Sequence, residues 1–268
     1  MSARIEDLAA RLDAAVRGGT AIPQLAAEAG QPALGLDDAY AVQRAGVVLR
    51  TARGELVSGA KLGFTSRAKA EQMGVSDVII GVLTDAMAVP QGAELDLGRA
   101  IHPRVEPEIA FLLGGDVDPA VATADELAAA VTHVAPALEV IDSRYRDFRF
   151  SLADVVADNT SACAYALGAW VPVAEVRERL DLAALDVILT IDGADVAQGS
   201  TADILGDPWA ALPAVHRMAR RHGQALRRGG VLLAGAATAA VPLPAGVAVT
   251  AAIAGLGSVT LRTRGEAS

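Results

Sequence analysis

Apolar residues recur with helical spacing near the start of the chain and with strand spacing over most of the remainder. Residues 4–17 and 36–53 carry apolar side chains at helical spacing, which predicts two amphipathic helices. We expect the second helix to be capped by Asp37 or Asp38 and to end at Gly54. Strands are expected at 56–64, 78–89, 104–113, 134–142, 162–171, 186–192, 230–235 and 247–262.

Shorter helices should interrupt this strand-rich pattern. One is expected at 66–74, with Ser66 as its cap. Another is expected at 123–131, headed by Thr123 or Asp125. The caps are assigned to these residues because their side chains can accept hydrogen bonds from the free N–H groups of a first helical turn.

A longer helix is expected near the C-terminal end, at about 207–227. Asp207 is a suitable N-cap, and Pro208 suits the first helical position because its missing N–H is not needed there. Pro213 lies further in, so this helix should either kink or begin later.

The order of these elements predicts the fold class. Strands do not alternate regularly with helices, which disfavours a doubly wound sheet and favours an α+β architecture with a large, mixed, rolled β-sheet. We expect a small N-terminal helical lobe over 1–85 and a β-roll domain over 86–268. Two Trp, three Tyr and four Phe leave the core to Ala, Val and Leu. Such sheets often complete their burial in oligomers, so we expect a homo-oligomer.

Composition and charge exclude several classes of function. A net charge of −9 disfavours nucleic-acid binding, and an anionic substrate would need a metal or local basic residues to reverse the field. We expect no membrane partner, since apolar runs stay short of a membrane span. The beginning of the chain lacks an apolar signal segment, and Cys163 is the only cysteine, so a cytoplasmic location is expected.

Three glutamates in apolar strands are the strongest chemical feature. Glu106 and Glu108 lie two apart on one expected strand and so share a face, and Glu139 lies in a second apolar run. Burying such carboxylates is costly unless a positive group compensates them. Oxygen ligands without nearby His or Cys suit Mg²⁺ or Mn²⁺. The alternative is a wet strand face, or pairing with Arg104 or Arg144.

Other motifs are incomplete. Residues 54–61 nearly match a phosphate-binding loop, but Lys61 comes one position late and no Ser or Thr follows it. The spacing of the four histidines does not match a zinc site. We expect His216 and His222 to face solvent on a basic helix.

Several segments together resemble a known enzyme group. They are KLGFTS at 61–66, IHPRVEPEIAF at 101–111, LEVIDSRY at 138–145, VADNTS at 156–161, AAVP at 239–242 and GLGS at 255–258. In order and spacing they resemble the 2-hydroxypentadienoate hydratase and 2-oxo-3-hexenedioate (4-oxalocrotonate) decarboxylase group of the fumarylacetoacetate-hydrolase-like superfamily. The resemblance implies a rolled sheet of that type and a role in aromatic meta-cleavage catabolism.

The resemblance also implies functional residues and partners. Glu106, Glu108 and Glu139 match the ligands of Mg²⁺ or Mn²⁺, and Lys61 matches the active-site lysine. Relatives are homo-oligomers, and the decarboxylases of the group associate with a partner hydratase, so the same is expected here.

Residue 79 favours one branch of the group. Hydratases usually carry Pro-Asp-Phe-Gly where this chain has Val78-Ile79-Ile80-Gly81. Hydration needs a group that activates water, and isoleucine cannot do so. We therefore expect decarboxylation of 2-oxo-3-hexenedioate to 2-hydroxypenta-2,4-dienoate, with Ile79 in a dry wall of the substrate site. The hydratase alternative would need Asp77 or Asp85 as a substitute acid.

Further roles follow from the expected chemistry. Lys61 would hydrogen-bond or protonate the developing oxyanion. The distal carboxylate needs only weak neutralisation, because a tight salt bridge would favour the ground state. Arg144 either orients the substrate or pairs with Asp142 or Glu139. Ser161 and Thr238 are candidate carboxylate donors.

Two departures and two other functions remain open. Gly206-Asp207-Pro208 and the segment 234–238 differ from the usual patterns of the group and could alter the substrate. Cleavage of a β-diketone would want a Glu–His pair, for which His102 is the candidate. A non-catalytic scaffold of a hydratase complex would not need to bind Mg²⁺.

Overall fold

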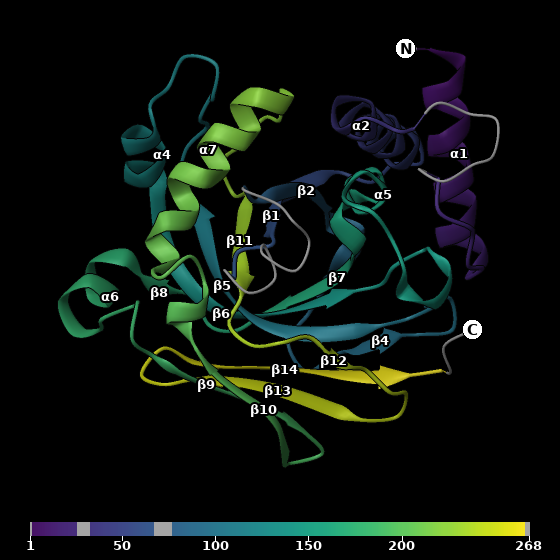
Figure 1. The fold of residues 1–268 in the computed structure, drawn as a ribbon. Helices are drawn as coiled ribbons and strands as arrows, with labels where there is room; N and C mark the ends of the chain where they lie inside the picture. The colour runs from purple at the N-terminus through teal and green to yellow at the C-terminus, as the bar shows by residue number, and fades with distance from the viewer. Residues whose placement is uncertain (1, 26–32, 67–76, 266–268) are drawn as a thin grey trace.

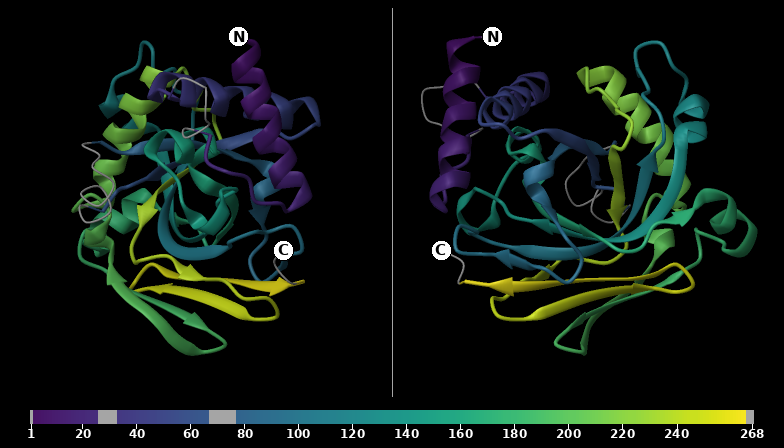
Figure 2. Two further views of the ribbon diagram at one scale, coloured as in Figure 1. Left: turned by 45° about the vertical axis from the view of Figure 1, so that its right-hand side comes forward. Right: turned by 180° about the vertical axis from the view of Figure 1, so that it is seen from behind.

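A computed structural model describes residues 2–25, 33–66 and 77–265. Within them, the chain forms a large curled sheet, a smaller sheet packed beneath it, and helices above it (Figure 1). Figure 2 shows the same layers from two further sides, with the smaller sheet along the base of the molecule. This arrangement confirms the predicted α+β class with a mixed, rolled sheet.

The larger sheet has a central pair of long strands. Its described strands are, in spatial order, β2 (Ile79–Thr84), β1 (Val57–Gly63), β11 (Val231–Ala236), β5 (Arg104–Leu113), β6 (Val131–Ile141), β7 (Ala162–Leu167) and β3 (Ala88–Val89), with β12 (Val241–Pro242) on β5 and β8 (Val171–Pro172) on β6. The β1–β11 and β3–β7 pairs are parallel and the others antiparallel, so the sheet is mixed.

The smaller sheet covers one face of the long strands. Its described strands are, in spatial order, β10 (Ala194–Ser200), β9 (Asp186–Ile191), β13 (Ala248–Ile253), β14 (Gly257–Arg264) and β4 (Glu94–Asp96). Val105, Leu138 and Val140 of the larger sheet pack with Leu189 and Val249 of the smaller one. Burying these aliphatic side chains fixes which face of β5 and β6 points away from the smaller sheet.

The helices complete the fold. The longer ones are α1 (Ala3–Gly18), α2 (Leu36–Ala52) and α7 (Ala211–His222), and the shorter ones are α4 (Ala124–Ala130), α5 (Leu152–Ala157) and α6 (Val173–Arg179). Single 3₁₀ turns are η1 (Asp85–Met87), η2 (Arg146–Phe148), η3 (Asn159–Ser161), η4 (Thr201–Asp203) and η5 (Pro208–Ala210). No helix in the described part of the chain is long and apolar enough to cross a membrane.

Helix ends were only partly predictable. Thr123 forms a reciprocal capping box with Glu126, as its position indicates. Asp207 caps η5, and α7 begins later, at Ala211, which places Pro213 in its first turn. The expected caps of α2 were wrong, because its N-cap is Gly35 and both aspartates lie inside the first turn. There their charge favours the helix through its dipole.

Other differences concern segments of the chain. The expected 247–262 strand is a hairpin of β13 and β14, turned at Gly255 with φ +73°. The expected helix at 66–74 lies outside the described residues. Strands β1 and β2 share one sheet with β5 to β7, while the division at residue 85 stays a prediction.

The expectation that His216 and His222 face solvent was wrong. Both are buried. The His216 ring contacts the Ala122 carbonyl oxygen through Nε2 at 2.8 Å. The His222 ring stacks on Tyr40 with 3.4 Å between ring centroids. The neighbouring arginines misled the prediction, because a histidine can pack as an aromatic ring on the buried face of a helix that is basic on its other face.

Candidate active site

The register of β5 against β6 gathers the three glutamates. Glu106 lies directly opposite Glu139 on the neighbouring strand, and Glu108 follows two residues along the same face. One carboxylate oxygen from each lies within 4.8 Å of the others. Glu106 is 5% exposed and the other two are fully buried. The predicted grouping of these residues is therefore present in the fold.

A bulge in β11 holds one of these carboxylates. The register between β11 and β5 shifts between Leu233 and Ala236, which frees the Gly235 N–H to donate to Glu108 Oε2 at 2.8 Å. Gly235 has φ +122°, and a Cβ there would lie 2.1 Å from Thr65 Oγ1. Only glycine fits both constraints. Sequence reasoning missed this role, although it noted the unusual 234–238 segment.

Lys61 enters the cluster from β1. Its Nζ lies 3.0 Å from Glu139 Oε2 and donates to the Thr160 carbonyl oxygen at 3.2 Å. The side chain runs past Gly81 of β2, where an added Cβ would lie 3.1 Å from Lys61 Cδ. Lys61 is 2% exposed, so it is not a surface lysine. Lys61 pairs with Glu139, whereas the alternative to a metal site had named Arg104 or Arg144 as partners of the glutamates.

Among the described residues, the cluster carries more negative than positive charge. Burial, and repulsion by Glu139 and Glu106, raise the pKa of Glu108 well above its ordinary range. Burial likewise raises the pKa of Glu139, although Lys61 opposes this. For Lys61, burial lowers the pKa, but attraction to the three glutamates outweighs burial and the net shift is upward. Among the described residues, Lys61 thus places one ammonium group beside three carboxylates in a buried setting.

The unsatisfied oxygens fit a divalent cation. Glu108 Oε1 and Glu139 Oε1 are buried and meet no hydrogen-bond partner among the described residues. Leaving such atoms unpaired is costly, and a hard cation removes that cost by binding them directly. The donor set, three carboxylates without His or Cys, matches Mg²⁺ or Mn²⁺. These residues can therefore hold the ion that the sequence predicts.

A cavity of about 530 Å³ opens beside the cluster. Lys61 and Glu106 form its polar floor, and Ile79 is part of its wall, packed against Gly63 of β1. Further lining residues are Gln24, Phe64, Arg104, Ile141, Phe148, Arg149, Phe150, Val155, Thr160, Ser161, Ala239 and Ala240. The volume suits a small organic acid.

One strained segment supplies hydroxyl groups to this cavity. Asn159, Thr160 and Ser161 have φ of +49°, +53° and +58°. Such values are uncommon outside glycine and persist only where the surroundings impose them. Asn159 is fixed by hydrogen bonds with the backbone N–H and carbonyl of Val82. Thr160 Oγ1 and Ser161 Oγ are buried and meet no partner among the described residues, so both are available to a ligand.

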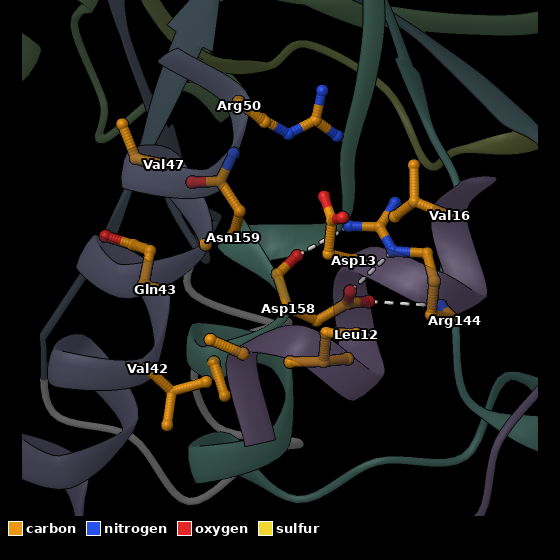
Figure 3. Close-up of a pocket in the computed structure, with 13 residues that line it drawn as sticks. Leu12, Asp13, Val16, Val42, Gln43, Val47, Arg50, Arg144, Asp158 and Asn159 are labelled. Atoms are coloured by element: carbon orange, nitrogen blue, oxygen red, sulfur yellow. Dashed lines mark hydrogen bonds and ion pairs between the residues drawn. The ribbon is translucent and has the colours of Figure 1, made fainter. Parts of the chain in front are cut away.

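Arg144 lies behind this segment, and its contacts indicate a structural role. Its guanidinium donates to the Asp158 carboxylate and to the carbonyl oxygens of Asp142, Asp158 and Ala162. Figure 3 shows Arg144 turned toward Asp158, beside side chains of α1 and α2. Burial raises the pKa of Asp158 to about 6, against the opposing effect of Arg144. Arg144 is absent from the lining of the large cavity.

The remaining predicted residues are placed as follows. Thr238 lies next to the cavity-lining Ala239, but its hydroxyl donates to the Ala239 carbonyl and it does not line the cavity. His102 packs edge-on against Phe148 and is likewise outside the lining. Asp207 accepts a hydrogen bond from the Trp209 N–H as a turn cap, which accounts for that departure structurally.

Comparison with known proteins agrees with this geometry. Residues 59–264 match the model of the fumarylacetoacetate (FAA) hydrolase C-terminal family. The chain belongs to the fumarylacetoacetate hydrolase family. Among its relatives, a 4-oxalocrotonate decarboxylase from Pseudomonas sp is 47% identical over 98% of this chain and 99% of that protein.

Two further relatives mark the branches of the family near this chain. A solved structure of 4-oxalocrotonate decarboxylase from Pseudomonas putida G7, complexed with magnesium and adipate, is 32% identical and superposes with a TM-score of 0.88, covering 97% of each chain. A 2-keto-4-pentenoate hydratase from Paraburkholderia xenovorans (strain LB400) is 36% identical over 85% of this chain and 84% of that protein.

Proposed function

We propose that this protein decarboxylates 2-oxo-3-hexenedioate to 2-hydroxypenta-2,4-dienoate, with Mg²⁺ or Mn²⁺ as cofactor. The observation that carries the proposal is Ile79 in the cavity wall, beside Lys61 and the glutamate cluster. An apolar wall tolerates loss of CO₂ but cannot activate water. The 47% identity with a 4-oxalocrotonate decarboxylase supports the same activity.

The ion would be held by Glu106, Glu108 and Glu139. When bound, it would supply Lewis-acid stabilisation for negative charge that develops on the 2-oxo group of the substrate. The Gly235 N–H keeps Glu108 oriented for this role.

The chain's own residues act on the substrate oxygens. In the substrate, the C2 ketone and the C3–C4 double bond make the distal carboxylate vinylogous to that of a β-keto acid. The C5–C6 bond breaks, CO₂ leaves, and the electron pair shifts through the double bond to the C2 oxygen. Lys61 Nζ donates a hydrogen bond or a proton to that oxygen. Ser161 Oγ, which is buried and has no hydrogen-bond partner among the described residues, would donate to the C1 carboxylate.

Hydration of 2-hydroxypenta-2,4-dienoate is the second candidate, favoured by the hydratase relatives. It would require a substitute acid in the cavity. Asp77 pairs with Arg217, and Asp85 accepts hydrogen bonds from the Leu56 and Ala86 N–H groups. Neither aspartate lines the cavity. The geometry therefore favours decarboxylation.

A paired ultraviolet assay tests the choice. With Mg²⁺ present, one sample contains 2-oxo-3-hexenedioate and the other 2-hydroxypenta-2,4-dienoate, each with and without chelator. We expect chelator-sensitive CO₂ release from the first and no change in the second. Consumption of the second compound alone would establish hydration and refute the decarboxylase proposal. Absence of both reactions together with absence of Mg²⁺ binding would favour the scaffold alternative.

We also propose that the protein acts in the cytoplasm as a homo-oligomer that can associate with a partner hydratase. Apolar side chains on the smaller sheet support the oligomer, because Ile188 of β9 is 38% exposed and Val196 of β10 is 41% exposed. Light scattering of the purified protein, alone and mixed with a hydratase relative, should give masses above one chain. A monomeric mass in both samples would refute this proposal.

A further inference from the structure

A second basic residue shares the strand face of the metal cluster. Arg104, Glu106 and Glu108 occupy alternate positions along β5, so their side chains leave the strand on one face. Arg104 and Glu106 both line the large cavity. The function proposed above uses Lys61 and the glutamates but gives Arg104 no task.

Arg104 forms no ion pair with a carboxylate of the described residues. Among the described residues, no acidic group lies within ion-pair distance of its guanidinium. Its contact is instead the face of Phe148, whose ring centroid lies 4.5 Å from Arg104 Cζ. A cation over an aromatic face keeps its N–H donors free at the edges of the guanidinium plane.

The backbone is strained where it presents Phe148. Asp147 and Phe148 have φ of +58° and +55°, values that disfavour residues with a side chain. The strained turn sets Phe148 against Arg104 and against the Phe150 ring, at 5.4 Å between centroids. Strain of this kind is retained where the surroundings impose it, often at ligand sites. Here it fixes the direction of a half-buried cation.

The distance between Arg104 and Glu106 matches the length of the substrate. Residues two apart on a strand are separated by roughly 6.6 Å. The terminal carbons of an extended six-carbon diacid are separated by roughly 6 Å. With the 2-oxo acid end beside Lys61 and Glu106, the distal carboxylate therefore comes within reach of Arg104.

We propose that Arg104 receives the distal carboxylate and selects dianionic 2-oxo acids over monoanionic ones. This inference rests on the proposed function and names the specificity residue of that same site. Because the Arg104 cation also contacts Phe148, it neutralises the carboxylate only in part. Arg104 thus contributes to substrate affinity without strongly opposing loss of CO₂.

Calorimetric measurement of ligand binding in the presence of Mg²⁺ tests the proposal without requiring turnover. The probes are 2-oxohexanedioate and 2-oxohexanoate, which share one end and one length and differ in the distal carboxylate. Neither has the conjugated double bond that the decarboxylation needs. The wild-type protein should prefer the diacid. Arg104→Gln should weaken diacid binding about 10- to 100-fold, as loss of a charge-assisted hydrogen bond predicts, and change monoacid binding less than about twofold.

Matched variants make the test specific. Arg149→Gln removes the other arginine of the cavity and should leave the diacid preference unchanged. Arg104→Lys should restore part of the preference. With 2-oxo-3-hexenedioate, Arg104→Gln should raise KM by a similar factor and keep kcat within about threefold, because a partly neutralising contact favours the ground state only weakly.

Three outcomes would overturn the inference. The first is an equal loss of affinity for both ligands in Arg104→Gln. The second is a loss of the diacid preference in Arg149→Gln instead of Arg104→Gln. The third is a wild-type protein that binds both acids equally. Melting temperature and Mg²⁺ affinity of each variant show whether the fold and the metal site are intact. A diacid preference that depends on Arg104 would stand even if no CO₂ were released, so failure of the proposed reaction is distinguishable.

Discussion

The glutamate–lysine cluster and the Arg144–Asp158 pair both bury charge, but among the described residues the pair is complete and the cluster is not. Asp158 accepts hydrogen bonds from the backbone and side chain of Arg144, whose remaining donors meet carbonyl oxygens. In the cluster, Lys61 faces three carboxylates, and two of their oxygens meet no partner among the described residues. A buried charge balanced by the chain serves the fold, whereas an unbalanced one calls for a ligand.

The two regions are also joined in the sequence. The segment 159–161 follows Asp158 directly and contributes the Thr160 carbonyl to Lys61 and the Ser161 hydroxyl to the cavity. The balanced pair thus anchors the strained backbone that supports the unbalanced cluster. Removing one charged side chain should therefore lower the free energy of unfolding at the Arg144–Asp158 pair but not at the metal-free glutamate cluster.

The largest effect is expected from Glu106→Gln. It removes one of three carboxylates, so Mg²⁺ affinity should fall at least about 100-fold, since changes beyond the direct ligands already cost 10- to 100-fold. Turnover should be lost. In chelator, however, the variant should be at least as stable as the wild type, because repulsion with Glu108 is relieved. Calorimetric Mg²⁺ titration and thermal unfolding measure both effects.

Glu175→Gln is a matched control for this change. It removes the same charge from the exposed face of α6, where Glu175 pairs with Arg179. Its Mg²⁺ affinity and turnover should equal those of the wild type. Unchanged turnover of Glu106→Gln at limiting metal would refute the ligand assignment.

Lys61→Ala should separate metal binding from turnover. Removing a cation beside the site leaves the three glutamates free to bind Mg²⁺, so affinity should be kept or increased. The rate should fall about 10²- to 10⁴-fold, the usual contribution of a positioned proton donor. Lys61→Met fills the same space and should lose the rate equally. A wild-type rate in either variant would reduce Lys61 to a structural role.

Arg144→Met should act mainly on stability. It leaves Asp158 buried without its cation, a loss of about 3–5 kcal/mol in the free energy of unfolding. The double variant Arg144→Met with Asp158→Asn should regain part of that loss, since no lone charge remains. Denaturant unfolding of the two variants checks this. Full stability with a lost rate would instead support the predicted substrate role of Arg144.

The sequence predicted the metal cluster because two of its three glutamates lie close together along the chain. Glu106 and Glu108 share a strand face by spacing alone, and the surrounding apolar residues indicated burial. The resemblance implied that Glu139 joins this cluster, but the strand register that sets it opposite Glu106 was not predicted. The long strand β5 was predicted with its bounds.

Contacts between distant segments were beyond prediction. The Gly235 bulge, the left-handed run at 159–161 and the Arg144–Asp158 pair depend on how loops meet the sheet. Their sequence signals are weak, because only tertiary packing holds Thr160 and Ser161 at positive φ. Arg144 was read as a candidate for substrate because a charge in a motif does not reveal its partner.

The smallest expected effect concerns His222, a buried group that is neutral instead of paired. Burial, with Arg221 and Arg44 nearby, lowers its pKa to about 4. Because an unfolded histidine has a pKa of about 6.5, the unfolded state binds a proton first as pH falls. Stability should therefore decrease between about pH 6.5 and pH 4, by up to about 1.4 kcal/mol per pH unit from this group.

His222→Phe keeps the stacking on Tyr40 and cannot titrate. Denaturant unfolding in chelator should show a weaker pH dependence for this variant across that window. Identical pH dependence would mean that solvent reaches the ring and that the native site does not hold it neutral.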